Sequence, residues 1–147
     1  MTIRERIQEG IKQATKDRDQ VRLETLRMAK GALLLKEKES PHEHGVSDEE
    51  AVAALRAEVK KRQQSMETYE QVGRMDTVET LKQEIAVIEE YLPKQLDEAA
   101  LGAKVREYLA EHPEINHAGK LTGALKKELG DLADGRMLSE LCKKALE

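Results

Sequence analysis

Apolar residues recur every three or four positions along most of this chain, which is the period of an α-helix with one buried face. No run alternates β-branched or aromatic residues with polar ones, as a half-buried strand would. The chain has no Phe, no Trp and three Tyr. Its core must therefore consist of aliphatic stripes on packed helices, and the sequence predicts an all-α fold.

Breaks in this period predict two helices near the N-terminus. Thr2 and Glu5 have the spacing of a capping box and indicate the start of the first helix. The second helix is expected over residues 19–39, and Pro41 ends it because proline lacks the N–H donor and clashes with the preceding turn. The residues expected to face inward are Ile3, Ile7, Ile11 and Ala14 in the first helix, and Leu23, Leu26, Leu33 and Leu34 in the second.

A long helical hairpin is predicted next. Ser47 is the expected cap of a helix over residues 47–71, and Gly73 is its expected end. Asp76 is the expected cap of an antiparallel partner over residues 76–91. The inward residues are Val52, Leu55, Val59, Met66 and Tyr69 in the longer helix, and Val78, Leu81, Ile85, Ile88 and Leu92 in its partner.

After Pro93 the expected helices are shorter and the breaks more frequent. Asp97 and Asp134 are predicted caps, and the segments between breaks make three short helices that form a compact bundle. We therefore expect an N-terminal helical domain over residues 1–93 and a C-terminal tail domain over residues 94–147. The inward residues of the tail are Leu101, Val105, Tyr108, Leu109, Leu121, Leu125, Leu129, Met137, Leu138, Leu141 and Ala145.

The charge of the chain is nearly balanced, with 25 basic and 29 acidic residues and a net charge of −4. Such a balance gives no global attraction to nucleic acid or to anionic membranes. The longest apolar runs are too short for a transmembrane helix, and the N-terminus lacks the apolar segment of a secretory signal. With a single cysteine, no internal disulfide can form. These features predict a cytoplasmic protein without a membrane partner.

The chain shows no recognisable catalytic motif. It has nine glycines but no glycine-rich phosphate loop. Cys142 has no His or acid beside it that would complete a nucleophilic dyad. One interpretation is a reactive thiol whose pKa is lowered by Lys143 and Lys144. The alternative, which we favour, is a half-buried cysteine that packs as a small apolar group. We expect no catalytic residue and no cofactor.

Two histidines form an HxH pattern in the predicted surface loop, at His42 and His44. Such a pair can hold zinc or nickel adventitiously. A structural zinc site needs four ligands, usually with cysteine. We therefore expect no metal site.

Glu58 and Arg62 are four residues apart in the predicted long helix, a spacing that suits an ion pair. Both lie close to its apolar face. One interpretation is a structural polar pair that orients the hairpin against the first helices. The other is an arginine that belongs to a binding site. We favour the structural pair.

Basic residues cluster in the last two predicted helices. On antiparallel helices they would form one patch, in which each neutralised phosphate adds to a salt-dependent affinity. Tyr108 is the only aromatic residue of the tail, which leaves little scope for base stacking. The alternative is an ordinary solvated face. The candidate RNA-binding residues are Lys120, Lys126, Lys127, Arg136, Lys143 and Lys144.

Several motifs together resemble the GatB/YqeY family, most closely its free-standing YqeY-like proteins. The most specific motif runs from Glu84 to Leu96 and includes EEYLPKQL. The resemblance covers nearly the whole chain, although Asp131 stands near a turn where the family often has a basic residue. The other matching motifs are Arg22-Leu23-x-Thr25-Leu26-Arg27, Glu58-x-x-x-Arg62-x-x-Ser65, Tyr69-Glu70-x-x-Gly73-Arg74, Gly119-Lys120-Leu121 and Ala133-Asp134-Gly135-Arg136.

This resemblance implies a two-part helical protein related to the tail of the B subunit of the tRNA-dependent amidotransferase. In that enzyme the tail contacts tRNA, and the chemistry lies in a separate domain. We therefore expect a tRNA-binding accessory module in tRNA-dependent amidation, with amidotransferase or synthetase components as candidate partners. The alternative is a helical protein-interaction adaptor that binds no RNA. Carbon–nitrogen ligase activity with glutamine as amido-N-donor has the least support.

Overall fold

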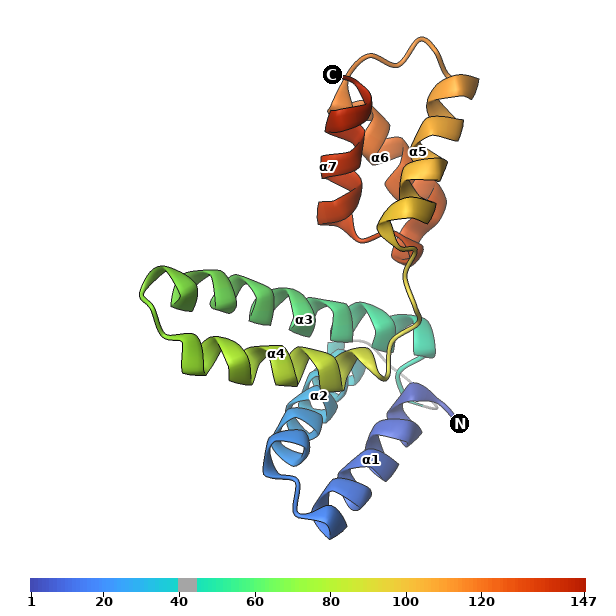
Figure 1. The fold of residues 1–147 in the computed structure, drawn as a ribbon. Coiled ribbons are helices and arrows are strands. Elements are labelled where there is room, and N and C mark those ends of the chain that lie inside the picture. The colour runs from blue at the N-terminus through green and yellow to red at the C-terminus, as the bar shows by residue number, and fades with distance from the viewer. Residues whose placement is uncertain (40–44) are drawn as a thin grey trace. The chain divides into compact units, whose positions relative to one another are not determined.

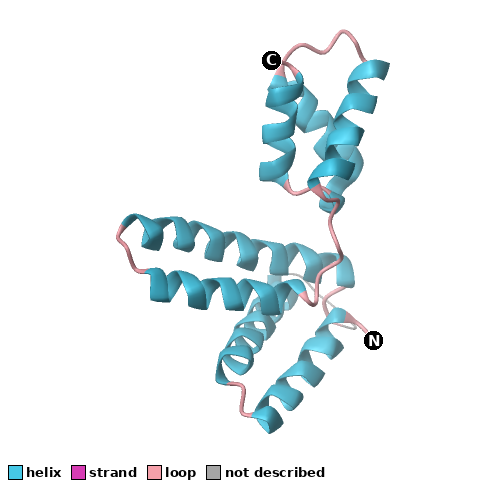
Figure 2. Cartoon of the chain, in the orientation of Figure 1, coloured by secondary structure: helices cyan, strands magenta, loops and turns pink. Residues whose placement is uncertain are grey.

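The computed structural model describes residues 1–39 and 45–147. Within these residues the chain forms α-helices, one short 3-10 turn and loops, and no strand (Figures 1 and 2). The predicted all-α fold is confirmed. The α-helices are α1 (Ile3–Asp17), α2 (Gln20–Glu39), α3 (Asp48–Gln71), α4 (Met75–Glu89), α5 (Glu98–Glu111), α6 (Ala118–Leu129) and α7 (Gly135–Ala145).

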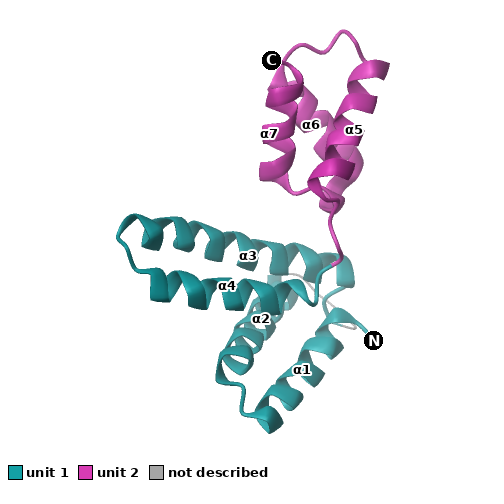
Figure 3. Cartoon of the chain, viewed as in Figure 1, with its two compact units in different colours: residues 1–92 teal, residues 93–147 magenta. Residues whose placement is uncertain are grey.

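The chain divides into two compact units, residues 1–92 and residues 93–147 (Figure 3). Unit 1 contains α1 to α4, and unit 2 contains α5 to α7. Each unit has its own cluster of buried hydrophobic side chains.

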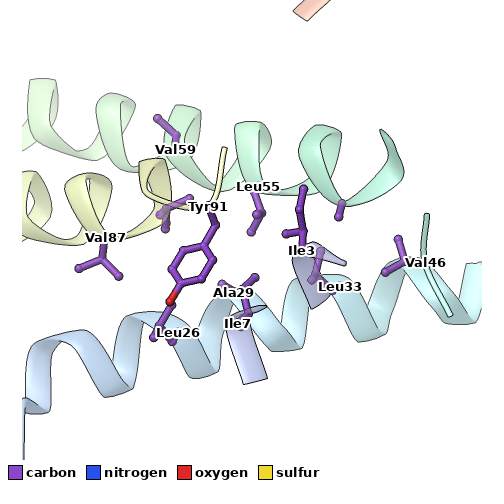
Figure 4. Close-up of a cluster of buried hydrophobic side chains, with 12 residues drawn as sticks. Ile3, Ile7, Leu26, Ala29, Leu33, Val46, Leu55, Val59, Val87 and Tyr91 are labelled. Carbon is purple, nitrogen blue, oxygen red and sulfur yellow. The ribbon is translucent and has the colours of Figure 1, made fainter. Parts of the chain in front are cut away.

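In unit 1, α1 and α2 form one helical pair, and α3 and α4 form the long hairpin (Figure 1). Helix α2 is central because it packs extensively against each of the other three helices, whereas α3 contacts α1 only slightly. Leu26 of α2, Leu55 of α3 and Ile88 of α4 are at most 1% exposed. Ile7 of α1 and Tyr91 complete the same core (Figure 4). Aliphatic side chains from all four helices thus replace the absent large aromatics.

Local capping determines where several helices begin. The Thr2 hydroxyl accepts a hydrogen bond from Glu5 N at the start of α1. Ser47 and Glu50 form the complete capping box of α3. Asp97 accepts from Ala100 N at the start of α5, at 2.8 Å. Each of these caps satisfies backbone donors that the first turn leaves unpaired.

The predicted capping role of Asp76 is wrong. Helix α4 begins at Met75, and its N-cap residue, Arg74, makes no side-chain capping bond. Gly73 ends α3 as predicted, with φ +74°, and Arg74 N then donates to Tyr69 O at 2.9 Å. This αL turn closes one helix and starts the next within a few residues, so Asp76 falls in the first turn of α4.

Helix α4 also ends earlier than predicted, at Glu89 instead of residue 91. Tyr91 N donates to Ile88 O and Leu92 N donates to Glu89 O, so the chain tightens into turns before Pro93. The predicted stop at Pro41 lies outside the described residues.

Three residues that were expected to face inward are exposed: Leu34, Tyr69 and Ala145. Leu34 lies one position beyond the buried Leu33, which turns it about 100° away from the core. Tyr69 and Ala145 lie in the last turns of α3 and α7, where fewer neighbouring residues cover a side chain.

Unit 2 is a three-helix arrangement around a small aliphatic core. Asp134 caps α7 by accepting from Arg136 N at 3.1 Å. The segment before α5 is held to the 3-10 turn at Gly130–Leu132, because Leu96 N donates to Leu132 O at 2.8 Å. The buried residues of this core are Leu101, Val105, Leu121, Leu125, Ala133, Leu138 and Cys142.

Gly10→Ala is expected to destabilise the protein by about 1–3 kcal/mol. A Cβ at Gly10 would collide with the Tyr91 hydroxyl and lie 3.0 Å from Leu26 Cδ1. Urea unfolding followed by circular dichroism measures the change. Gly31→Ala is the matched control, because a Cβ there meets no atom within 4 Å. It should stabilise the protein by about 0.5–1 kcal/mol through helix propensity. Equal effects of the two substitutions would contradict close packing at Gly10.

Candidate nucleic-acid interface

The six candidate RNA-binding residues are all exposed on α6 and α7. These helices pack against each other and run in opposite directions (Figure 1). The end of α6 therefore meets the start of α7, where a Cβ built on Gly135 would lie 2.6 Å from Lys126 Nζ. The structure thus brings Lys126 beside the first turn of α7, which carries Arg136.

The remaining cations follow from the helix directions. Lys120 lies in the first turn of α6, at the end of the pair where α7 finishes with Lys143 and Lys144. Lys127 follows Lys126 in the last turn of α6. The basic residues therefore occupy both ends of the helical pair rather than one compact point.

Five of these residues are lysines without a carboxylate partner among the described residues: Lys120, Lys126, Lys127, Lys143 and Lys144. Lysines of unit 1 such as Lys60 and Lys82 also lack a carboxylate partner among the described residues, but several arginines there are paired. Arg22 Nη1 lies 2.6 Å from Glu90 Oε2, and Arg4 Nε lies 3.2 Å from Glu37 Oε1. An ammonium group without a counter-charge is free to neutralise a phosphate.

Tyr108, the single aromatic side chain of unit 2, stacks on His112. The ring centroids are 4.1 Å apart and the planes differ by 17°. The imidazole therefore covers one face of the phenol ring, and both residues are half-buried in α5 and at its end. This arrangement leaves unit 2 poorly suited to base stacking.

The predicted polar pair lies at a junction of three helices. The Arg62 side chain on α3 is 7% exposed and lies 3.5 Å from Glu58 Oε1. Its Nη1 donates to the Glu58 backbone oxygen at 3.1 Å, and its Nη2 lies 3.6 Å from the Met28 sulfur on α2. Glu84 of α4 adds a second carboxylate, 3.8 Å from Arg62 Nε. One buried cation thus contacts α2, α3 and α4.

The Arg62 site lacks features of an open binding site. Glu58 and Glu84 are 12% and 19% exposed, and Arg62 Nε is buried without a hydrogen-bond partner. The guanidinium offsets one of the two carboxylate charges, and Lys61 Nζ, which lies 3.1 Å from Glu58 Oε2, offsets the other. Its geometry therefore favours a role in orienting the helices.

A second polar cluster, not anticipated from sequence, lines a solvent-open groove of about 290 Å³ in unit 1. Arg22 binds the Glu90 carboxylate through both terminal nitrogens, at 2.6 and 3.2 Å. Arg6 Nη2 donates to the Glu90 backbone oxygen at 3.0 Å, and its guanidinium lies over the Tyr91 ring. The hydrogen bonds that Arg22 donates to Glu90 raise the pKa of Arg22, so this cation stays charged.

The signal for this cluster was weak in the sequence. Arg22 and Glu90 each lie within a family-like motif, but 68 residues separate them. No local spacing relates the two. Because Arg22 and Arg6 both bind Glu90, we assign the cluster to holding the end of α4 against α1 and α2.

Cys142 is fully buried rather than half-buried as predicted. Burial raises the pKa of its thiol, and a hydrogen bond with Thr122 opposes that shift. The side chain belongs to the core of unit 2. A neutral, enclosed thiol is a packing group, which agrees with the apolar interpretation.

No group of three or more His, Cys, Asp or Glu side chains able to hold a metal occurs in the described parts of the chain. His42 and His44 lie outside those parts. Among the same described residues, no helix is long and apolar enough to cross a membrane.

Arg62→Met is expected to lower the free energy of unfolding by about 3 kcal/mol, because it leaves the largely buried Glu84 carboxylate without its cation and Glu58 with only the exposed Lys61. Adding Glu58→Gln and Glu84→Gln should recover most of that loss, since neutral amides do not require a cation. Urea unfolding measures both effects. Lys60→Met, at an exposed position of the same helix, is the control and should change stability by less than about 0.5 kcal/mol. A triple variant as unstable as Arg62→Met would argue against charge compensation.

Comparison with known proteins agrees with the motifs. A family model described as Yqey-like protein matches residues 4–146. The matched region includes nearly all of both compact units. A search of curated proteins found no match. The resemblance to YqeY-like proteins is thus confirmed by a match over almost the whole chain, and the protein belongs to the YqeY-like family.

Proposed function

We propose that this protein is a tRNA-binding accessory module of tRNA-dependent amidation, acting in the cytoplasm, and that unit 2 contacts the RNA. The observation that carries the proposal is the set of unpaired lysines on α6 and α7. Family membership supports it, because the resemblance relates the chain to the amidotransferase tail that contacts tRNA. Amidotransferase or synthetase components would then supply the chemistry.

The proposed contact is with the RNA backbone. Lysine ammonium groups bind phosphates as point charges, and they carry no sequence information. Tyr108 is engaged with His112, so stacking on unpaired bases contributes little. Recognition would therefore depend on the shape of folded tRNA and on the spacing of its phosphates.

Salt dependence follows from this mode of binding. Each phosphate that a lysine neutralises releases condensed counterions, so affinity falls as salt rises. The acidic residues Glu128, Asp131 and Glu140 lie among the cations. They restrict the number of phosphates that bind at once, and we expect a weak, strongly salt-sensitive complex.

A protein-interaction adaptor is the second candidate function. The observation that favours it lies at the tip of the α3–α4 hairpin, where Val72 and Met75 are 67% and 57% exposed. An exposed apolar pair on a charged hairpin suits the anchoring of a protein partner. This candidate predicts that binding partners are recovered without RNA and that Val72→Asp with Met75→Asp abolishes their capture.

Reversing two charges tests the tRNA proposal. Lys126→Glu with Lys127→Glu should weaken tRNA binding at least about tenfold at low salt, because it removes two phosphate contacts and adds repulsion. It should also lower the slope of log affinity against log salt by about 1–2. Fluorescence anisotropy with labelled tRNA at several salt concentrations measures both quantities.

The matched control is Lys60→Glu with Lys82→Glu, which reverses two exposed lysines of unit 1. It makes the same change in net charge and should leave the affinity within about twofold of the unmodified chain. Equal weakening by both variants would show a nonspecific charge effect. The absence of salt-sensitive tRNA binding by the unmodified chain would refute the proposal.

A further inference from the structure

Helix α2 carries a line of exposed apolar side chains on the face turned away from the core. Val21, Met28 and Leu35 are 36%, 54% and 67% exposed. They are seven residues apart, which is nearly two helical turns, so they share one face. Helix α2 already packs against the three other helices of unit 1. This line is therefore apolar surface that unit 1 leaves uncovered.

Gly31 lies on this face between Met28 and Leu35. A Cβ at Gly31 would meet no atom within 4 Å. The rest of the described chain therefore imposes no steric need for glycine there, although glycine destabilises a helix interior relative to alanine. Bare backbone does allow the close approach of another helix. Close packing against something outside this chain would account for glycine at this position.

The charges on the same face are complementary to those of a second α2 helix that runs in the opposite direction. Glu24 precedes Gly31 by seven residues and Lys38 follows it by seven, so each lies about 10 Å away along the helix. The Glu24 carboxylate accepts a hydrogen bond from Gln20 Nε2 at 2.8 Å. Neither Glu24 nor Lys38 is in an ion pair with a described residue.

From these observations we propose that α2 is a self-association surface, on which a second copy of this chain packs antiparallel about a two-fold axis at Gly31. Such an axis places each Glu24 opposite Lys38 of the other copy, which forms two equivalent ion pairs. Met28 and Leu35 flank the crossing and are buried there. A parallel arrangement would instead place Glu24 against Glu24, which the charges oppose.

The contact would also affect the Arg62 cluster. The exposed Met28 side chain lies against the guanidinium, with its sulfur 3.6 Å from Arg62 Nη2. A second copy that covers Met28 would shield the cluster from water on its α2 side. Self-association and the internal packing of unit 1 would then support each other.

Sedimentation equilibrium of the full chain at low salt, over micromolar to millimolar concentrations, tests the proposal. We expect a reversible monomer–dimer equilibrium that Gly31→Gln shifts to monomer, because a side chain at the crossing separates the two helices. Gly123→Gln is the matched control, since Gly123 also lies within a helix with no atom within 4 Å of a Cβ. It should leave the dimer unchanged. Circular dichroism checks that each variant is folded.

Charge exchange tests the antiparallel arrangement. Glu24→Lys and Lys38→Glu should each raise the dimer dissociation constant about tenfold or more, since each creates two like-charge contacts. The two substitutions together restore opposite charges and should return the constant to near its original value. A chain that stays monomeric throughout would overturn the proposal. A dimer whose dissociation constant does not change with Gly31→Gln would also overturn it. So would a double variant that dimerises no more tightly than either single variant.

Discussion

The burial of α2 against three other helices is the interaction on which unit 1 depends. Leu26 and Leu33 are almost completely removed from water, and each buried aliphatic side chain contributes about 1.5–3 kcal/mol. The polar contacts are arranged around this packing. Arg62 joins α3 and α4 beside Met28 of α2, while Arg22 of α2 binds Glu90 just after α4. These ion pairs join helices that the apolar contacts hold together.

The placement of unpaired lysines underlies the functional proposal. In unit 1, carboxylates compensate arginines across helices, as in the Arg22–Glu90 and Arg62–Glu84 contacts. In unit 2, five lysines on α6 and α7 have no carboxylate partner among the described residues. The net charge of the chain conceals this, because it averages compensated and uncompensated groups. A local cationic surface on a mildly acidic protein suits a weak, salt-sensitive polyanion contact.

Much of the helical organisation was predictable because its causes are local. Thr2, Ser47, Asp97 and Asp134 begin helices through hydrogen bonds within three residues, so their sequence spacing reveals them. Gly73 ends α3 for an equally local reason, its positive φ. The errors arose where distant or competing contacts decide the outcome. After the αL turn at Gly73, α4 begins at Met75, so Asp76 lies in its first turn and not at the cap. Helix α4 ends early, and the turns that follow it include Glu90, which Arg6 and Arg22 both bind.

The sequence alone determined the helical period, most helix starts, the family and the concentration of lysines in the last two helices, because each of these depends on residues close together in the chain. Only the tertiary structure decided which charges are compensated. Glu84 reaches Arg62 from another helix, and Glu90 reaches Arg22 across 68 residues. It also decided that Cys142 is enclosed and that the line through Met28 and Gly31 is open. Burial and ion pairing depend on which helix faces meet, and sequence spacing does not specify those faces.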